Sequence, residues 1–182
     1  MANHSETESA RMFFALWPDG RTRTALDQAA GKVLRQCGGR RTRRETIHMT
    51  LVFLGDVPLS RLEQLRVAAT GITLPAFSVP INRLGWWKHN QILWAGTDAV
   101  PELLSELSGQ LRERLTAAGF SFDTKAFVPH VTLLRKAQCP DREFPPLAAE
   151  WKVGSFVLVR SAQSALGAAY EIVGRWELFK DI

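Results

Sequence analysis

A duplicated unit of strand, helix and histidine motif constrains this sequence more than any other feature. In the first copy, residues 12–17 predict a strand, 19–37 a helix, and His48-Met49-Thr50-Leu51 follows. In the second, residues 91–97 predict a strand, 101–118 a helix, and His130-Val131-Thr132-Leu133 follows. The motifs lie 31 residues after Trp17 and 33 residues after Thr97. Such a repeat implies two similar lobes related by an approximate twofold axis, with a cleft between them.

Each motif places a histidine and a threonine two residues apart in a run of apolar, β-favouring residues. Side chains alternate between the two faces of a strand, so His48 and Thr50 share one face, as do His130 and Thr132. The residues between them are apolar and would anchor the opposite face in the core. Two such strands brought together would place two imidazoles and two hydroxyls around one small cavity.

The rest of the pattern predicts one more helix and several antiparallel strands. Ser60 with Glu63 forms a capping box that opens a helix through Thr70. We expect this helix to bury Leu62, Leu65, Val67 and Ala69. The tight connection over 88–90 predicts an antiparallel hairpin that ends with the strand over 91–97. Residues 153–160 and 169–179 predict two final strands, joined by a polar turn around 163–167.

The predicted fold class is therefore α+β. We expect a bilobal arrangement with a pseudo-twofold internal repeat, in which two mainly antiparallel sheets flank a central cleft and the helices lie on the outside. Residues 1–10 are polar and are predicted to form a disordered tail. Residues 11–182 are predicted to form one domain of two intertwined lobes, each contributing one motif. Because the repeat supplies both halves of the site, we expect a monomer.

Composition favours a globular protein over a disordered or membrane-spanning chain. The hydrophobic share is 46% and the charged share 23%, and no apolar run approaches the roughly 20 residues that cross a bilayer. Cys37 and Cys139 match no metal or redox spacing, so we expect free thiols in a reducing cytoplasm. The net charge of +5 permits a polyanionic partner. The sharpest local charge, residues 40–44 (RRTRR), is explained equally well as a solvated connection.

Two histidines with ordinary pKa values of about 6.5 suit general acid–base chemistry at neutral pH. In-line attack at phosphorus needs a base on the entering water and an acid on the leaving oxygen, and a twofold arrangement puts the imidazoles on opposite sides. Threonine hydroxyls can donate hydrogen bonds to the phosphate oxygens. This scheme requires no metal or other cofactor, and a 2′,3′-cyclic phosphate would suit it. A zinc site would lack carboxylate or thiolate ligands beside either motif, and two merely structural histidines would leave the duplicated context unexplained.

The segments FFALWPD, IHMTLVFLGDV and PHVTLLRKA resemble bacterial RNA 2′,3′-cyclic phosphodiesterases. That family, also called 2′-5′ RNA ligase-like, belongs to the two-histidine (2H) phosphoesterase superfamily. The resemblance spans residues 12–179. It implies a site in the central cleft and hydrolysis of RNA 2′,3′-cyclic phosphate ends to 2′-phosphates, tRNA fragments being among the substrates. By reversal, it also implies the joining of RNA ends through a 2′-5′ linkage without ATP.

The resemblance also implies roles for individual residues. His48 would be the proton donor to the 3′ oxygen and His130 the proton acceptor that activates water, while Thr50 and Thr132 hold the phosphate. Arg135 would contact phosphate as well. Its odd offset from His130 aims it at the opposite face of a regular strand, so either a bulge or the strand end redirects it, or Lys136 is the nearer cation.

Aromatic residues near the cleft could hold an RNA base. Phe14 is the candidate lining residue because its strand would neighbour a motif strand, and Trp86 and Trp87 could flank the cleft. Two other functions remain open: the same chemistry on a 2′-5′ oligonucleotide or a small cyclic nucleotide, or a non-catalytic module that grips an RNA end. Binding alone does not need proton donors and acceptors, which favours the enzyme.

Overall fold

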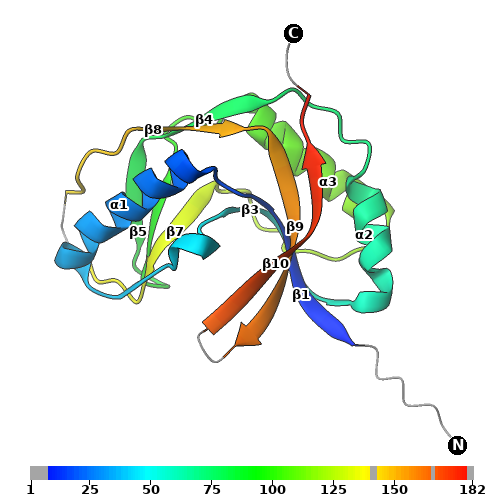
Figure 1. The fold of residues 1–182 in the computed structure, drawn as a ribbon, viewed down its shortest axis with the longest axis horizontal. Coiled ribbons are helices and arrows are strands. Elements are labelled where there is room, and N and C mark those ends of the chain that lie inside the picture. Colours follow the sequence, from blue (N-terminus) through cyan, green and yellow to red (C-terminus); the bar gives the residue numbers. More distant parts are fainter. Residues whose placement is uncertain (1–7, 140–142, 165–166, 180–182) are drawn as a thin grey trace, which may run out of the picture.

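An eight-stranded antiparallel sheet forms the centre of the fold in a computed structural model that describes residues 8–139, 143–164 and 167–179 (Figure 1). The strands in the described residues are β1 (Ser9–Leu16), β2 (Arg40–Arg41), β3 (Met49–Pro58), β4 (Phe77–Ile81), β5 (Arg83–Trp87), β6 (Ile92–Gly96), β7 (His130–Arg135), β8 (Ala149–Val153), β9 (Ser155–Ser164) and β10 (Gly167–Glu177). The order is β10-β9-β1-β3-β7-β6-β5, with β2 paired to β7, and β4 and β8 form a separate two-stranded sheet.

The α+β class is confirmed, but the two expected main sheets are one. The motif strands β3 and β7 lie next to each other and are joined through the Met49–Val131 pair. This pair ties the halves into a single sheet, which the pattern of alternation could not reveal. Because pairing is confined to this position, the two strands diverge on either side of it. The expected overall twofold relation between two lobes remains a prediction.

The two longer helices form where the sequence predicts them. They are α1 (Gly20–Cys37) and α3 (Glu102–Ala117), and they lie at opposite ends of the molecule (Figure 1). The Asp19 carboxylate caps α1 by accepting a hydrogen bond from the Thr22 N–H at 2.8 Å. Both helices bury one apolar stripe against the strands: Leu26, Ala29, Ala30, Val33 and Cys37 in α1, and Leu104, Leu107, Leu111 and Leu115 in α3.

The capping box predicted for the third helix does not form. Residues Leu59–Arg61 make a 3₁₀ turn, so α2 spans only Leu62–Ala69 and has no side-chain cap. Glu63 instead forms an ion pair with Arg66 at 3.2 Å. Val67 is 64% exposed rather than buried. Residues two apart on a helix face different directions, so the face that holds Leu65 also holds Ala68 and Ala69 and excludes Val67.

The ends of the chain also differ from the prediction. Ser9 and Ala10 belong to β1 and not to a tail, and Ala10 is buried beside Val57; residues 1–7 lie outside the described residues. The strand expected over 153–160 is split at Gly154, because β8 pairs with β4 and β9 pairs with β1 and β10. Of the predicted turn around 163–167, residues 165–166 lie outside the described residues.

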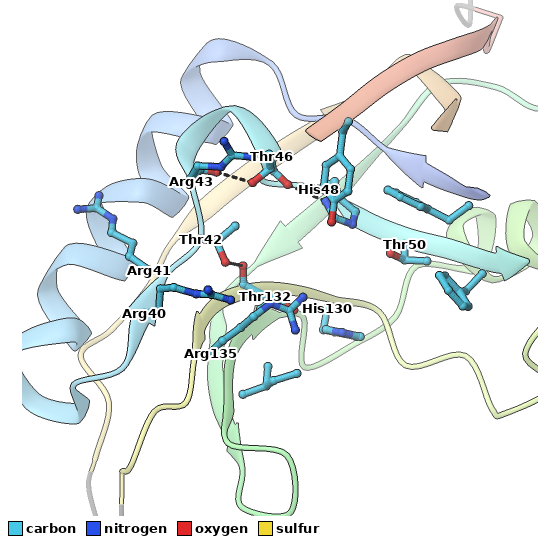
Figure 2. Close-up of a pocket in the computed structure, with 14 residues that line it drawn as sticks. Arg40, Arg41, Thr42, Arg43, Thr46, His48, Thr50, His130, Thr132 and Arg135 are labelled. Atoms are coloured by element: carbon cyan, nitrogen blue, oxygen red, sulfur yellow. Dashed lines mark hydrogen bonds between the residues drawn. The ribbon is translucent and has the colours of Figure 1, made fainter. Parts of the chain in front are cut away.

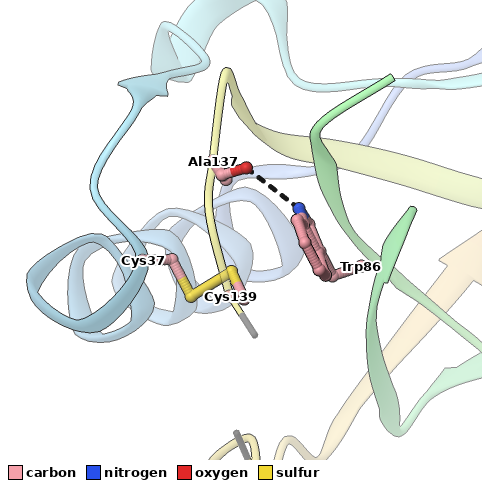
Figure 3. The surroundings of a disulfide bond; sticks show 4 residues. All are labelled: Cys37, Trp86, Ala137 and Cys139. Atoms are coloured by element: carbon pink, nitrogen blue, oxygen red, sulfur yellow. Dashed lines mark hydrogen bonds between the residues drawn. A yellow bond between two sulfur atoms is a disulfide. The ribbon is translucent and has the colours of Figure 1, made fainter. Parts of the chain in front are cut away.

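Cys37 and Cys139 form a disulfide and are not free thiols (Figure 3). They are 102 residues apart, so no local spacing of cysteines predicts the pairing. The fold brings the last residue of α1 against the segment after β7, where the Gln138 N–H donates to the Cys37 carbonyl at 2.9 Å. The Trp86 Nε1–H holds the same segment through the Ala137 carbonyl at 3.0 Å (Figure 3). The expectation of a reducing cytoplasm rested on free thiols, so the disulfide removes its support.

In the described ranges, no helix is both long and apolar enough to cross a membrane.

Candidate active site

Both motifs open onto one cavity of about 360 Å³ at the junction of β3 and β7 (Figure 2). His48 and Thr50 line it from β3 and its approach, and His130 and Thr132 line it from β7. The structure thus brings together the four residues that the sequence predicts. Phe13, Phe53, Ile92, Arg135 and Tyr170 also line the cavity.

The two motif strands carry the same irregularity one residue after the threonine. On β3, Thr50 pairs with Ala15 and Val52 with Phe14, which leaves Leu51 as an extra residue. On β7, Thr132 pairs with Trp94 and Leu134 with Leu93, which leaves Leu133. An extra residue of this kind shifts the alternation of faces.

The bulge on β7 explains why the Arg135 side chain faces the cavity. It returns the fifth residue after His130 to the cavity face, so Arg135 lines the cavity. Lys136, with φ of 55°, is exposed where the chain leaves the strand. Phe53, the fifth residue after His48, lines the cavity for the same reason.

Each histidine ring is fixed by a backbone carbonyl two residues earlier. His48 Nδ1 lies 2.7 Å from the Thr46 carbonyl oxygen, and His130 Nδ1 lies 2.8 Å from that of Val128. A carbonyl can only accept a hydrogen bond, so Nδ1 carries the hydrogen in both rings. The Nε2 atom of each neutral ring is then left with its lone pair for chemistry.

The surroundings of the two rings differ. The His48 ring stacks on Trp17 at 5.7 Å between ring centres, with Phe13 at 4.9 Å and Tyr170 perpendicular to it at 5.4 Å. The His130 ring contacts Trp87 in a T-shaped arrangement, with 4.7 Å between the ring centres. His48 is accordingly the more deeply buried of the two.

Burial lowers the pKa of both histidines, whereas the sequence led us to expect ordinary values. The pKa of His48 falls to about 4, chiefly because burial disfavours the charged ring, with the positive charge of Arg135 acting in the same direction. Burial and Arg135 also lower the pKa of His130. Both rings are therefore neutral at pH 7 in the free protein.

The lowered pKa of His48 predicts a loss of stability in mild acid. Between pH 6.5 and 4 the unfolded chain binds a proton at this ring and the folded chain does not, so the free energy of unfolding falls as the pH falls. From pH 7 to pH 5 this ring should account for about 2 kcal/mol. Urea unfolding of wild type and His48→Gln at both pH values measures it, since the variant should lose less stability. Parallel losses in the two proteins would contradict the assignment.

The prediction that Phe14 lines the cleft is wrong. Its strand does neighbour a motif strand, but Phe14 is fully buried and packs against Phe156 and Trp176. Ala15 faces Thr50 across the β1–β3 pair. Side chains two apart share a face, so Phe13 and Trp17 lie on the side of the cavity. This register joins distant segments, so the alternation along β1 does not by itself show whether Phe13 or Phe14 faces the cavity.

Sequence reasoning also missed Tyr170, which reaches His48 from β10. Its position depends on the strand order β10-β9-β1-β3, for which the sequence around Tyr170 holds no signal. Of the two tryptophans expected to flank the cleft, Trp87 contacts His130, whereas Trp86 turns away to the Ala137 carbonyl. Within the described ranges, no three His, Cys, Asp or Glu side chains gather as a metal site would require.

An α+β fold that holds two His-x-Thr motifs on adjacent strands around one cavity defines a two-histidine phosphoesterase. The family described as "LigT like Phosphoesterase" matches residues 16–94 and 96–168, and this chain belongs to it. It is a hydrolase of the RNA 2′,3′-cyclic phosphodiesterase family, by similarity over most of its length.

Two relatives and one solved structure illustrate the similarity. The "RNA 2',3'-cyclic phosphodiesterase" of Escherichia coli is 28% identical over 94% of this chain and 98% of its own length. The protein of that description from Thermus thermophilus is 30% identical over 92% of this chain and 90% of its own. The crystal structure of E. coli LigT complexed with 3'-AMP superposes with a TM-score of 0.86, at 28% identity, covering 94% of this chain and 99% of that one.

Proposed function

We propose that this protein hydrolyses the 2′,3′-cyclic phosphate end of an RNA to a 2′-phosphomonoester, using its two histidines as acid and base and no metal. The observation that carries the proposal is the pair of imidazoles around one cavity, each anchored through Nδ1 to a backbone carbonyl at 2.7 or 2.8 Å. A base and an acid held in fixed tautomers are what in-line displacement at phosphorus requires.

In this mechanism His130 is the base. It is the less buried ring, so water reaches its Nε2 most readily. Water attacks phosphorus as it gives a proton to His130 Nε2, the bond from phosphorus to the 3′ oxygen breaks, and the 3′ oxygen takes a proton from His48 Nε2–H. The 2′ ester is kept. His48 takes up its proton from solvent as the substrate binds, and His130 gives its proton to solvent as the product leaves, which restores the two neutral rings of the free protein.

The negative charge of the substrate would favour the protonated form of His48, which the reaction needs. Its lowered pKa leaves His48 neutral in the free protein at pH 7. A phosphodiester carries one negative charge, and a negative charge beside an imidazole favours the protonated ring. Thr50, Thr132 and Arg135 line the same cavity and would hold the non-bridging oxygens, stabilising the charge that grows there during attack.

The same geometry accepts a 5′-hydroxyl in the place of water. Attack by the 5′ oxygen of a second RNA end would release the 3′ oxygen and leave a 2′-5′ phosphodiester. ATP is not needed, because the strained cyclic phosphate is already activated. We propose hydrolysis as the main reaction, since water is far more concentrated than RNA ends, and we propose that the protein acts as a monomer.

The deciding experiment incubates the pure protein with an RNA oligonucleotide ending in a 2′,3′-cyclic phosphate, with excess EDTA. The expected product is the 2′-phosphate, and chromatography against 2′- and 3′-phosphate standards identifies it. Activity that EDTA abolishes and a divalent metal restores would overturn the metal-free mechanism. Binding without turnover would indicate a module that grips RNA ends. Turnover confined to 2′-5′ oligonucleotides or small cyclic nucleotides would assign the chemistry to a different substrate.

A further inference from the structure

Two arginines face each other at the edge of the cavity. Arg40 of β2 pairs with Arg135 of β7 in antiparallel register, and directly opposed residues project from the same face of a sheet. Both arginines are exposed and line the cavity. Figure 2 shows both side chains extending toward Thr132, while Arg41 turns away toward α1.

These two charges have no counterion among the described residues. Neighbouring arginines do have partners: Arg41 forms an ion pair with Asp27 at 2.7 Å, and Arg44 donates to the Thr24 hydroxyl at 2.7 Å. No carboxylate stands among the described residues that line the cavity. Like charges directly opposite on adjacent strands destabilise a sheet, so this edge of the fold is suited to an anion between the two guanidinium groups.

The backbone of the segment that carries Arg40 is held to β7 by hydrogen bonds, so this segment is not a loose, solvated connection. The Thr42 N–H donates to the Leu133 carbonyl and the Thr42 hydroxyl to the Thr132 carbonyl, both at 2.9 Å. Gly39, with φ of 89°, lets β2 approach β7, since a Cβ there would lie 2.6 Å from the Arg135 carbonyl oxygen. The Cys37–Cys139 disulfide clamps the same two segments.

The two arginines extend from the reacting phosphate along β7. Arg135 is close enough to the catalytic centre to lower the pKa of both histidines. Arg40 lies opposite Arg135 on the short strand β2, which pairs with β7 beyond the His130-x-Thr132 motif. An RNA chain carries a phosphate at every nucleotide, and arginine is well suited to bind one through paired N–H groups.

We propose that Arg40 binds a second phosphate of the substrate, namely the backbone phosphate on the 5′ side of the terminal nucleotide, with Arg135 standing between this phosphate and the reacting one. This inference rests on the proposed function and names its substrate class: a polynucleotide end, not a free nucleoside cyclic phosphate. The run of arginines before the first motif thus includes one binding residue beside others that serve structure.

The test compares two substrates in wild type, Arg40→Gln and Arg44→Gln. The first substrate is the dinucleotide ApA with a 2′,3′-cyclic phosphate, which carries the second phosphate, and the other is adenosine 2′,3′-cyclic phosphate, which lacks it. Arg40→Gln is expected to lower kcat/KM for the dinucleotide about tenfold relative to kcat/KM for the mononucleotide, mainly by raising the KM of the dinucleotide. Arg44→Gln removes the same charge from the same segment outside the cavity and should keep the wild-type ratio. An equal fall for both substrates in Arg40→Gln would overturn the proposal.

A third substrate separates the phosphate from the base. Adenosine 2′,3′-cyclic phosphate with a 5′-phosphate carries the second phosphate without a second base, and its turnover should depend on Arg40 as the dinucleotide's does. Dependence seen only with the dinucleotide would overturn the proposal in favour of a base contact.

Calorimetric binding keeps the result independent of turnover. Adenosine 2′,5′-bisphosphate should bind Arg40→Gln about tenfold more weakly than wild type, with a much smaller change for 2′-AMP. If the bisphosphate shows this larger loss of affinity but the wild-type protein hydrolyses no cyclic phosphate, the proposed function is refuted and the second phosphate site is supported. Equal changes for the two ligands would refute the site alone.

Discussion

Replacing His130 by alanine is expected to lower kcat on a 2′,3′-cyclic phosphate RNA end by about 10²–10⁴-fold, and His48→Ala by a similar factor. Each change removes one of the two groups that exchange a proton with the substrate. Because the two histidines act in one displacement, the double variant should be little worse than either single variant. Single-turnover kinetics with saturating enzyme measures the effect on the chemical step.

His89→Ala is the matched control for these variants. His89 is exposed in the turn between β5 and β6 and should keep wild-type activity. Undiminished turnover in either His48→Ala or His130→Ala would sink the two-histidine mechanism. An aryl phosphodiester then separates acid from base, since its leaving group departs without a proton. Activity on it should survive the loss of His48 and vanish with the loss of His130.

Removing the Cys37–Cys139 disulfide is expected to cost about 2–4 kcal/mol of unfolding free energy, the second large effect. The bond closes a loop across a sequence separation of 102 residues and so restricts the unfolded chain strongly. For a domain of this size the loss corresponds to roughly a 10 °C fall in Tm. Thermal unfolding of Cys37→Ala/Cys139→Ala measures it; alanine is chosen because both sites are buried.

Reduction provides the control for the disulfide. Wild type treated with a thiol reductant should unfold at nearly the temperature of the double variant, and the reductant should leave the variant unchanged. If the oxidised wild type and the double variant unfold at the same temperature, the bond contributes nothing to stability.

The sequence predicts much of this fold because its strongest signals are local. The apolar stripes of α1 and α3 recur at helical spacing, and Asp19 marks the start of α1, so both helices are found where predicted. The capping box at Ser60 fails because the chain makes a 3₁₀ turn there first. The joining of two sheets through Met49–Val131 and the pairing of Cys37 with Cys139 depend on contacts between distant segments, and no local pattern encodes them.

The centre of the candidate site is predictable for the same reason. A histidine and a threonine two apart on a strand must share a face, and the duplication supplies the partner strand. The residues around this centre are less predictable, since bulges decide which of them turn inward. The extra residue after the threonine of each motif brings Arg135 and Phe53 to the cavity, and the alternation of side chains along β1 places Phe13, not Phe14, on the cavity side.

The matching bulges have a consequence for how an RNA end would lie. They place Phe53 and Arg135 at equivalent positions of the two motif strands, so the two strands present different side chains to the cavity. The β3 side of the cavity is aromatic, with Phe13, Phe53 and Tyr170, and the β7 side is cationic, with Arg40 and Arg135. A nucleotide is itself two-sided, with a flat base and a charged backbone. In the proposed reaction, an RNA end would therefore enter in one direction, with its base against β3 and its backbone along β7.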